Sequence, residues 1–352
     1  MTSYKITVEP LGCEIDCRDD QTILDACLRN GVWLPHSCTH GSCATCKAEV
    51  LEGDVDHGAS SSFALMDFER DEGKLLPCCA RPRSDVTIEA EIDVDEDLEI
   101  FPVQDYVGTV VSLEDIARDT KRIVIELDRD LDFNAGQYLK FQVPDAGVDR
   151  TYSIASLPTE KRLLEFHIRR TAGGVATDRW IFRSLAVGDQ MSVSGPYGRF
   201  VLHVGDDRPA VLVAGGTGLA PIKSMIRHAL ENNAYDGHLT LYQGARTQEW
   251  LYDVEEFQRL EEEYPDSFTY RPCLSEETAE GFSSGLVTAV IEMENDTLRG
   301  YAGYLCGPPP MVDAALKTLM GKRLFPRDIY REDFFNEGDK AAGGVRSPLI
   351  KR

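Results

Sequence analysis

The chain has 352 residues, 42% of them hydrophobic and 28% charged, which leaves room for two or three domains that each bury a core. Its formal net charge of -23 argues against nucleic-acid binding, because neutralising phosphates requires a surplus of Lys and Arg. No apolar run reaches 18 residues, and the first residues alternate like a strand instead of forming a signal peptide. We therefore expect a cytoplasmic protein with no membrane contact.

Residues 1–93 are predicted to form the first domain. Residues 4–9 and 13–17 alternate like half-buried strands, and a helix is expected near 22–30 with Gly31 as its stop signal. Strands near 47–51 and 85–91 close the domain. Residues 1–100 carry 22 acidic and 8 basic side chains, a net charge of -14. This surplus either serves solubility or forms a face that speeds encounter with a basic partner surface.

A cysteine pattern indicates an iron–sulfur site in this domain. Cys38, Cys43 and Cys46 have the spacing C-x4-C-x2-C, and Cys78 follows after 31 residues, which is the plant-type spacing for a two-iron, two-sulfur cluster. Small residues between the cysteines let the loop point its amide groups at a negatively charged cluster. Structural zinc is the alternative, but zinc sites favour C-x2-C pairs on two knuckles. Only one of Cys78 and the adjacent Cys79 can be the fourth ligand.

The composition and residue pattern of the remaining chain change twice. Residues 94–103 are a charged run predicted to be a linker, and residues 104–204 are rich in strands and turn signals, which predicts a small antiparallel barrel. Residues 205–335 alternate strands and helices, which predicts a parallel sheet covered on both faces. The expected strands are 210–214, 239–244, 267–274 and 302–306, and the expected helices are 221–232, 251–263, 285–292 and 310–320. The polar residues 336–352 are predicted to be a frayed tail.

The barrel region carries the sequence R-T-Y-S at residues 150–153. Arg150 can pair with a pyrophosphate, Tyr152 offers a flat face to an isoalloxazine ring, and the Ser153 hydroxyl can hydrogen bond to flavin N5. This pattern resembles the R-x-Y-S signature of the ferredoxin-reductase-like flavin barrel. Alone it is weak, and an ordinary barrel strand is the alternative.

Two neighbouring features support a flavin site. Gly174 and Thr177 belong to a glycine-containing loop before a helical stretch that starts at Asp178, which predicts a second phosphate cradle made of backbone N–H groups. His167 and Arg169 lie on the intervening strand and are expected to border the flavin. An exposed strand face is the alternative for both. We therefore predict bound FAD.

A second glycine-rich turn indicates a nicotinamide site. Gly215, Gly216, Thr217 and Gly218 follow a buried strand, and Pro221 opens the next helix. Glycines allow close approach of the backbone to a pyrophosphate. The turn resembles the G-G-T-G-x-x-P turn of ferredoxin-NADP reductase relatives, and a plain strand–helix turn is the alternative.

The same resemblance assigns residues at the ends of later strands. It places Cys306, Gly307 and Pro308 beside the nicotinamide, with Cys306 near the hydride path, and it makes Arg246 a contact of the ribose, for which an ordinary surface Arg is the alternative. Glu276 follows the strand 267–274, where NADP-selective relatives place Ser-Arg. A carboxylate repels a 2′-phosphate and accepts a hydrogen bond from a 2′-hydroxyl, so we predict NADH as the electron donor.

The order of cluster, flavin and nicotinamide modules resembles the reductase components of bacterial multicomponent oxygenases over residues 1 to about 335. It is most similar to phenol hydroxylase reductase, through the segments 31–35, 43–47, 51–55, 63–67 and 69–74. The resemblance implies a β-grasp ferredoxin domain (α+β), an antiparallel FAD barrel and a parallel α/β nicotinamide domain. It favours Cys78 as the fourth ligand, because residues 76–89 resemble the closing segment of plant-type ferredoxins. It also implies that Phe334 shields the flavin, with Phe335 as the alternative.

The resemblance also implies a function. NADH delivers hydride to FAD beside Ser153 and Cys306, electrons pass singly to the [2Fe-2S] cluster, and the cluster reduces a di-iron hydroxylase, the partner of a monooxygenase system. A reductase of a Rieske-type dioxygenase is the first alternative. A non-enzymatic electron carrier or redox sensor is the second.

Overall fold

The computed structural model describes residues 2–36, 39–92 and 98–334, and the chain divides into two compact units, Met1–Gln104 and Asp105–Arg352. Cys38, Phe335, residues 94–97 of the predicted linker and the predicted tail 336–352 lie outside the described residues. No helix of the described part is both long and apolar enough to cross a membrane.

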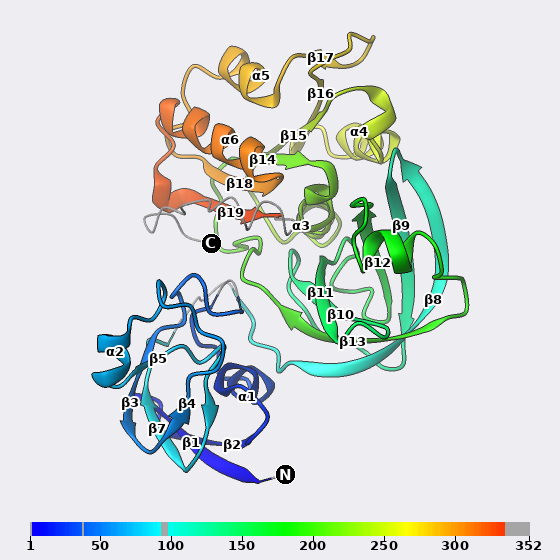
Figure 1. The fold of residues 1–352 in the computed structure, drawn as a ribbon. Helices are drawn as coiled ribbons and strands as arrows, with labels where there is room; N and C mark the ends of the chain where they lie inside the picture. The colour runs from blue at the N-terminus through cyan, green and yellow to red at the C-terminus, as the bar shows by residue number, and fades with distance from the viewer. Residues whose placement is uncertain (1, 37–38, 93–97, 335–352) are drawn as a thin grey trace. The chain divides into compact units, whose positions relative to one another are not determined.

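The first unit is a mixed sheet with one helix packed against it (Figure 1). Its strand order is β2-β1-β7-β3-β5, with β1 and β7 parallel and the other pairs antiparallel. This is the predicted β-grasp arrangement. Its elements are β1 (Ser3–Glu9), β2 (Cys13–Arg18), α1 (Ile23–Arg29), β3 (Ala48–Glu52), β4 (Val55–Asp56), α2 (Asp67–Asp71), β5 (Lys74–Leu75), β6 (Arg81–Pro82) and β7 (Val86–Glu89).

Local chemistry explains the limits of the helix in this unit. The Thr22 side chain accepts a hydrogen bond from the Asp25 amide and so caps α1 at its N-terminus. Gly31, with a φ of 73°, follows the helix in the left-handed conformation that ends helices. Residues 98–103 belong to this unit, because Leu98 and Val103 are buried and the Val103 amide donates to the Leu28 carbonyl.

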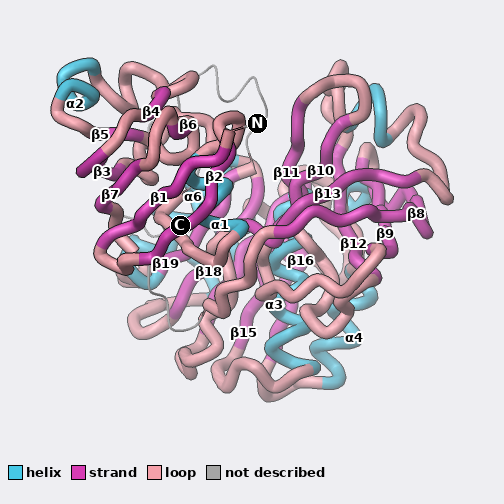
Figure 2. Tube along the Cα trace, turned by 90° about the horizontal axis from the view of Figure 1, so that it is seen from below, coloured by secondary structure: helices cyan, strands magenta, loops and turns pink. Residues whose placement is uncertain are grey.

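The second unit begins with a six-stranded antiparallel sheet of order β11-β10-β13-β8-β9-β12, in which β10, β13 and β8 run side by side (Figure 2). A bridge between Ile154 and Phe166 joins its two outer strands, so the sheet closes into the predicted barrel. The strands are β8 (Gln104–Ala117), β9 (Thr120–Leu127), β10 (Tyr138–Val143), β11 (Val148–Ser153), β12 (Leu163–Arg169) and β13 (Gln190–Tyr197), with a short π-helical segment, η1 (Thr177–Ile181).

A parallel sheet of order β17-β16-β15-β14-β18-β19 completes this unit. Buried residues of α3 and α4 pack on one face, and those of α5 and α6 pack on the other, so both faces are covered as predicted (Figure 1). The strands are β14 (Ala210–Gly215), β15 (Leu239–Ala245), β16 (Phe268–Leu274), β17 (Ser283–Ser284), β18 (Ala302–Gly307) and β19 (Ile329–Asp333). The helices are α3 (Leu219–Glu231), α4 (Val254–Glu263), α5 (Val287–Glu294) and α6 (Pro309–Gly321), with the short turns η2 (Gly216–Gly218), η3 (Gln248–Trp250) and η4 (Pro326–Asp328).

The strands β17 and β19 of this sheet are not among those that the sequence pattern predicts. The strand β19 pairs in parallel with β18 and places Glu332 opposite Cys306. Its five residues, Ile329–Asp333, contain three charged side chains, so they lack the apolar run that marked the other buried strands.

Candidate functional site

The cluster loop has a backbone suited to holding an anionic group. Thr39, Gly41 and Ala44 all have positive φ, between 54° and 78°, within six residues. Left-handed residues alternating with extended or right-handed ones turn successive N–H groups toward one side and make an anion-binding concavity. Thiolate ligands and such a concavity fit a [2Fe-2S] cluster, which carries negative charge. Cys38, the first predicted ligand, lies outside the described residues.

The other predicted ligands occupy buried or half-buried positions around this loop. Cys46 is 5% and Cys78 is 7% exposed, and Cys43 is partly exposed. A Cβ atom on Gly41 would lie 2.6 Å from the Cys79 sulfur, so the Cys79 side chain packs against the loop backbone. The Cys78 and Cys79 sulfurs lie 3.8 Å apart, so the assignment of the fourth ligand stays a prediction.

The strand β11 presents the R-T-Y-S residues at the end of the barrel. Arg150 and Tyr152 share one face, Tyr152 packs edge-on against Phe141 with ring centroids 4.9 Å apart, and Ser153 is buried at the strand's end. Burial raises the pKa of Tyr152, so its hydroxyl stays protonated. An aromatic face and a buried hydroxyl on one short strand suit a flavin ring.

Hydrogen bonds from backbone amides to nearby side chains hold the glycine loop before η1 in its conformation. The Gly173 amide donates to Asp178 at 2.9 Å, and the Thr171 amide donates to the Thr177 hydroxyl at 3.0 Å. A Cβ on Gly174 would lie 2.8 Å from that hydroxyl, so only glycine fits there without displacing Thr177. Because the Gly174 amide also donates within the loop, to Thr171 O, a phosphate would have to bind the amides of residues 175–177.

The nicotinamide turn is built by close packing of two strand ends. A Cβ on Gly218 would lie 2.3 Å from the Cys306 carbonyl oxygen, and one on Gly215 would lie 2.4 Å from the sulfur of Met311. Gly307, at φ 147°, approaches Gly215 equally closely. These glycines therefore let β14 and β18 meet, while Gly216, at φ 54°, has no atom closer than 3.6 Å to its missing Cβ.

A buried carboxyl group lies where the barrel and the parallel sheet meet. Ser153 of β11 hydrogen bonds to Glu332 of β19, and the Cys306 thiol faces the same carboxyl. Burial and the nearby charge of Asp333 raise the pKa of Glu332 to about 8, although the Ser153 bond opposes this. Burial likewise raises the pKa of the Cys306 thiol. The site thus holds a protonated carboxyl and a protonated thiol next to the predicted flavin-contacting hydroxyl at neutral pH.

Glu332 was missed by sequence reasoning, although it shares this site with both predicted catalytic residues. One of its carboxyl oxygens is buried and has no hydrogen-bond partner among the described residues. An orphaned buried oxygen beside Ser153 fits a site that closes on bound cofactors. The Phe334 amide donates to the Gly307 carbonyl at 3.0 Å, which fixes this residue at the same end of the sheet.

The predicted ribose contacts lie at the carboxyl ends of β15 and β16. Arg246 and Glu276 are exposed and 3.8 Å apart, and the Glu276 amide donates to the Arg246 carbonyl. The neighbouring Glu277 accepts two hydrogen bonds from Gln248. Two carboxylates at the strand ends agree with a 2′-hydroxyl partner and oppose a 2′-phosphate.

A second buried group of charges joins the barrel to the nucleotide domain within this unit. Lys223 of α3 is only 2% exposed, and its Nζ donates to Glu165 of β12 at 3.1 Å, to Asp253 at 2.8 Å and to Glu256 at 2.8 Å. Burial would lower the pKa of Lys223, but the three carboxylates outweigh it and raise this pKa. The ammonium is thus charged and shared between the two domains.

Two further barrel side chains complete this buried ion cluster. Arg122 of β9 lies 3.2 Å from Glu165 and pairs with Asp253, and His167 Nε2 lies 2.7 Å from a Glu165 oxygen. Burial alone would raise the pKa of Glu165, but the His167 hydrogen bond and the nearby cations hold it well below its usual range. Glu165, His167 and Asp253 have metal-ligand geometry, yet the Lys223 ammonium already supplies the cation there.

The ion cluster reaches the nicotinamide turn through Tyr252. Its ring packs edge-on against His167 at 4.9 Å, and its hydroxyl donates to the Gly216 carbonyl at 3.0 Å. His167, expected to border the flavin, hydrogen bonds to Glu165 and packs against Tyr252. Arg169 stacks on Trp250 at 4.6 Å and lies beside Gly216, so its guanidinium faces the nucleotide turn.

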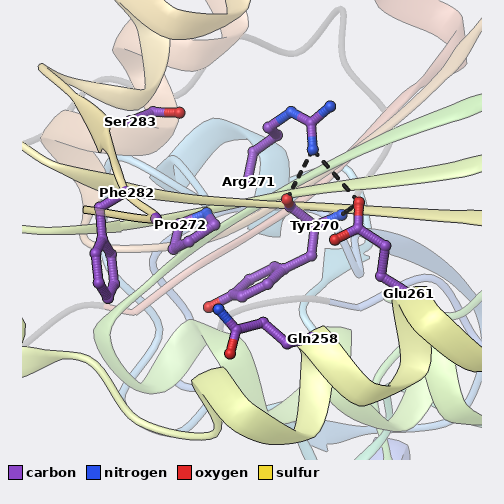
Figure 3. Close-up of a pocket in the computed structure, with 8 residues that line it drawn as sticks. Gln258, Glu261, Tyr270, Arg271, Pro272, Phe282 and Ser283 are labelled. Atoms are coloured by element: carbon purple, nitrogen blue, oxygen red, sulfur yellow. Dashed lines mark hydrogen bonds and ion pairs between the residues drawn. The ribbon is translucent and has the colours of Figure 1, made fainter. Parts of the chain in front are cut away.

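A separate polar groove of about 370 Å³ lies between α4 and β16 (Figure 3). Glu261 and Arg271 face each other across it at 3.4 Å. None of the predicted cofactor residues lines this groove, and it lies along the strands instead of at their carboxyl ends, where open α/β sheets bind nucleotides.

Comparisons with known proteins cover the whole chain. Three family models match in order: a 2Fe-2S iron-sulfur cluster binding domain (residues 6–83), an oxidoreductase FAD-binding domain (108–202) and an oxidoreductase NAD-binding domain (212–317). The chain is 46% identical to the phenol hydroxylase P5 protein of Acinetobacter pittii and 45% identical to the reductase component of phenol 2-monooxygenase of a Pseudomonas species, covering 99% of each chain in both cases. It is 41% identical to a crystal structure of an Amycolatopsis cytochrome P450 reductase, with a TM-score of 0.86 over 94% of this chain and 98% of that one.

These matches confirm the three predicted cofactors, NAD, FAD and a [2Fe-2S] cluster, and with them the predicted fold class. They decide against zinc in the cysteine loop. They do not identify individual ligand residues.

Proposed function

We propose, from the premise that this chain belongs to the family of phenol hydroxylase reductase components, that it carries electrons from NADH to the di-iron hydroxylase of a monooxygenase. The observation that supports this best is the meeting of Ser153, Cys306 and Glu332 in one buried place. It joins the end of a flavin-barrel strand to the carboxyl ends of the nucleotide sheet, where a hydride donor and acceptor have to meet. We place the protein in the cytoplasm, where NADH and reduced cysteines are available.

The proposed assignments follow the geometry. Tyr152 and Ser153 hold the flavin ring, with Arg150 and the loop before η1 at its phosphates. The turn at Gly216, with Arg169 and Arg246, holds the dinucleotide. When bound, FAD accepts a hydride and releases electrons one at a time to the cluster, which Cys38, Cys43, Cys46 and Cys78 ligate.

The protein's own side chains then determine the protonation state and the access of water where the electrons are transferred. Glu332 and Cys306 stay neutral below about pH 8, so neither places a negative charge beside the nicotinamide. Ser153 donates or accepts at the position proposed for flavin N5. Phe334, held by Gly307, covers this end of the sheet and excludes water.

The assignment of the fourth ligand can be tested with two adjacent substitutions. We expect Cys78→Ser to abolish the cluster absorbance and to leave NADH-driven flavin reduction intact. The matched variant Cys79→Ser should retain the cluster. Loss of the cluster in Cys79→Ser alone would reverse the assignment of ligand and packing residue.

The proposed function is tested by NADH-driven turnover with purified acceptors. We expect rapid reduction of flavin and cluster by NADH, followed by substrate hydroxylation when a di-iron phenol hydroxylase is added. Transfer to a Rieske-type dioxygenase at equal or higher kcat/KM would instead support the second candidate, since the chain is also 33% identical to the reductase component of a Pseudomonas putida naphthalene 1,2-dioxygenase system. NADPH used as well as NADH would contradict the role given to Glu276.

A further inference from the structure

One exposed segment of the ferredoxin unit has no part in holding a cofactor. Residues 63–68, F-A-L-M-D-F, expose Phe63 at 92%, Phe68 at 57% and Met66 at 48%. Large apolar side chains gathered on a soluble surface usually mark a site of contact with another molecule. The segment includes one of the stretches by which the chain resembles phenol hydroxylase reductase, yet the cluster does not need it.

The segment that leads into this patch, residues 58–61, contacts the cluster loop and Cys79. The Ser61 amide donates to the Gly41 carbonyl at 3.0 Å, and a Cβ on Gly41 would lie 3.0 Å from Ser60 Cα. A Cβ on Gly58 would lie 2.5 Å from the Cys79 carbonyl oxygen, next to the fourth proposed ligand. Because electron tunnelling slows steeply with distance, an acceptor has to dock near the cluster, and this surface is adjacent to it.

The patch is also held in place before any partner arrives. Ala64 and Leu65, between the exposed residues, are buried at 3% and 0% exposure. Arg70 donates to the Ser60 carbonyl and hydroxyl at 3.1 and 3.0 Å, and Lys47 pairs with Glu69 at 2.5 Å. The backbone of the patch is thus fixed before binding, so its ordering adds little to the entropy cost of forming a complex.

Charge identifies the kind of partner. Residues 52–73 contain seven acidic side chains and one basic side chain, Arg70. Asp67, Asp71 and Glu72 are exposed around the apolar centre. An acidic rim favours a partner with Lys and Arg around an apolar pocket and suppresses pairing with a second copy of this acidic face.

We propose that Phe63, Met66 and Phe68 form the docking centre for the hydroxylase component, which receives Phe63 in an apolar pocket rimmed by basic side chains. This inference rests on the proposed function, because it takes the hydroxylase as the acceptor. The acidic residues steer the encounter, and the aromatic side chains fix the complex close to the cluster.

The test compares Phe63→Ser with Met293→Ser, which removes an apolar side chain of α5 that is 77% exposed in the other unit. Two readouts are measured for each full-length holoprotein. The first is the anaerobic reduction of flavin and cluster by NADH, followed by absorbance without any partner. The second is the KM for a purified di-iron phenol hydroxylase in NADH-driven hydroxylation.

We expect Phe63→Ser to raise the KM for hydroxylase about tenfold or more, with cluster reduction unchanged, and Met293→Ser to change neither. Asp71→Asn with Glu72→Gln should reduce the dependence of hydroxylase turnover on salt. If Phe63→Ser slows cluster reduction by NADH instead, the patch serves the flavin barrel of this chain and the proposal is overturned. An unchanged KM also overturns it, whereas no turnover with wild-type protein would refute the proposed function itself.

Discussion

Glu165 and Glu332 are both carboxyl groups withdrawn from water within the same unit, yet their pKa values are displaced in opposite directions. Glu165 is surrounded by Lys223, Arg122 and His167, and its pKa lies well below the usual range. Among the described residues no cation contributes to the pKa of Glu332, and burial with the charge of Asp333 raises this pKa to about 8. Desolvation is common to both, so the presence of a buried cation decides the protonation state.

The difference in protonation state corresponds to two different roles, one structural and one chemical. A charged carboxylate with charged partners joins β12 to α3 and so fixes the barrel against the nucleotide domain. A neutral carboxyl beside a hydroxyl and a thiol can hold or release a proton where the cofactors meet. Three substitutions test this contrast.

The largest effect is expected from removing the buried cation. Lys223→Met leaves Glu165, Asp253 and Glu256 without their shared ammonium, and breaking a buried pair on one side costs about 3–5 kcal/mol. Thermal unfolding should therefore occur roughly 10 °C lower. The control is Arg227→Met, one turn along α3, which loses a more exposed pair with Glu231 worth about 1 kcal/mol or less and only long contacts to Glu160 at 3.7 Å and Glu256 at 4.0 Å.

Adding Glu256→Gln to Lys223→Met should restore part of the loss, because one uncompensated charge is removed. Equal effects of Lys223→Met and Arg227→Met would mean that the ion cluster does not hold the two domains together. The contrast between Glu165 and Glu332 would then lose its structural meaning.

A smaller, pH-dependent effect is expected at Glu332. Its folded pKa of about 8 lies above the unfolded value of about 4.3, so the folded state binds the extra proton between these pH values. Stability should fall as pH rises through that window, by about 1.4 kcal/mol per unit at most. Glu332→Gln should remove this slope, whereas Glu231→Gln, at an exposed position, should keep it. Denaturant unfolding at pH 6, 7 and 8 measures the difference, and identical slopes in wild type and Glu332→Gln would contradict a neutral Glu332.

Sequence patterns predicted the three cofactors and the fold class, because glycine turns, cysteine spacing and strand periodicity are local signals. They missed Glu332 for a physical reason. Its strand β19 is short and charged, and it becomes a buried strand only by pairing with β18. That pairing is a tertiary contact which no periodicity in residues 329–333 records.

The environment of His167 also could not be predicted from the sequence. Strand alternation puts His167, Glu165 and Arg169 on one face of β12, but it does not say what covers that face. Lys223 and Tyr252 cover it from elements more than 50 residues away. Gly215 and Gly218 were interpreted as room for a pyrophosphate, whereas the structure shows that they also allow two strand ends to touch.

The smallest effect is expected where the ion cluster meets the nucleotide turn. Tyr252→Phe keeps the ring against His167 and removes one hydrogen bond to Gly216, worth about 1 kcal/mol. If the cluster positions that turn, the KM for NADH should rise about fivefold with kcat nearly unchanged, since a uniform binding contribution is lost. Tyr235→Phe is the matched control, because it removes one hydrogen bond to a backbone carbonyl, that of Arg208, which precedes β14 whereas the turn follows this strand. It should cost similar stability and leave the KM for NADH unchanged. Equal KM values in the two variants would show that the buried ion cluster only stabilises the unit. The ion cluster would then have no influence on the chemistry at Glu332.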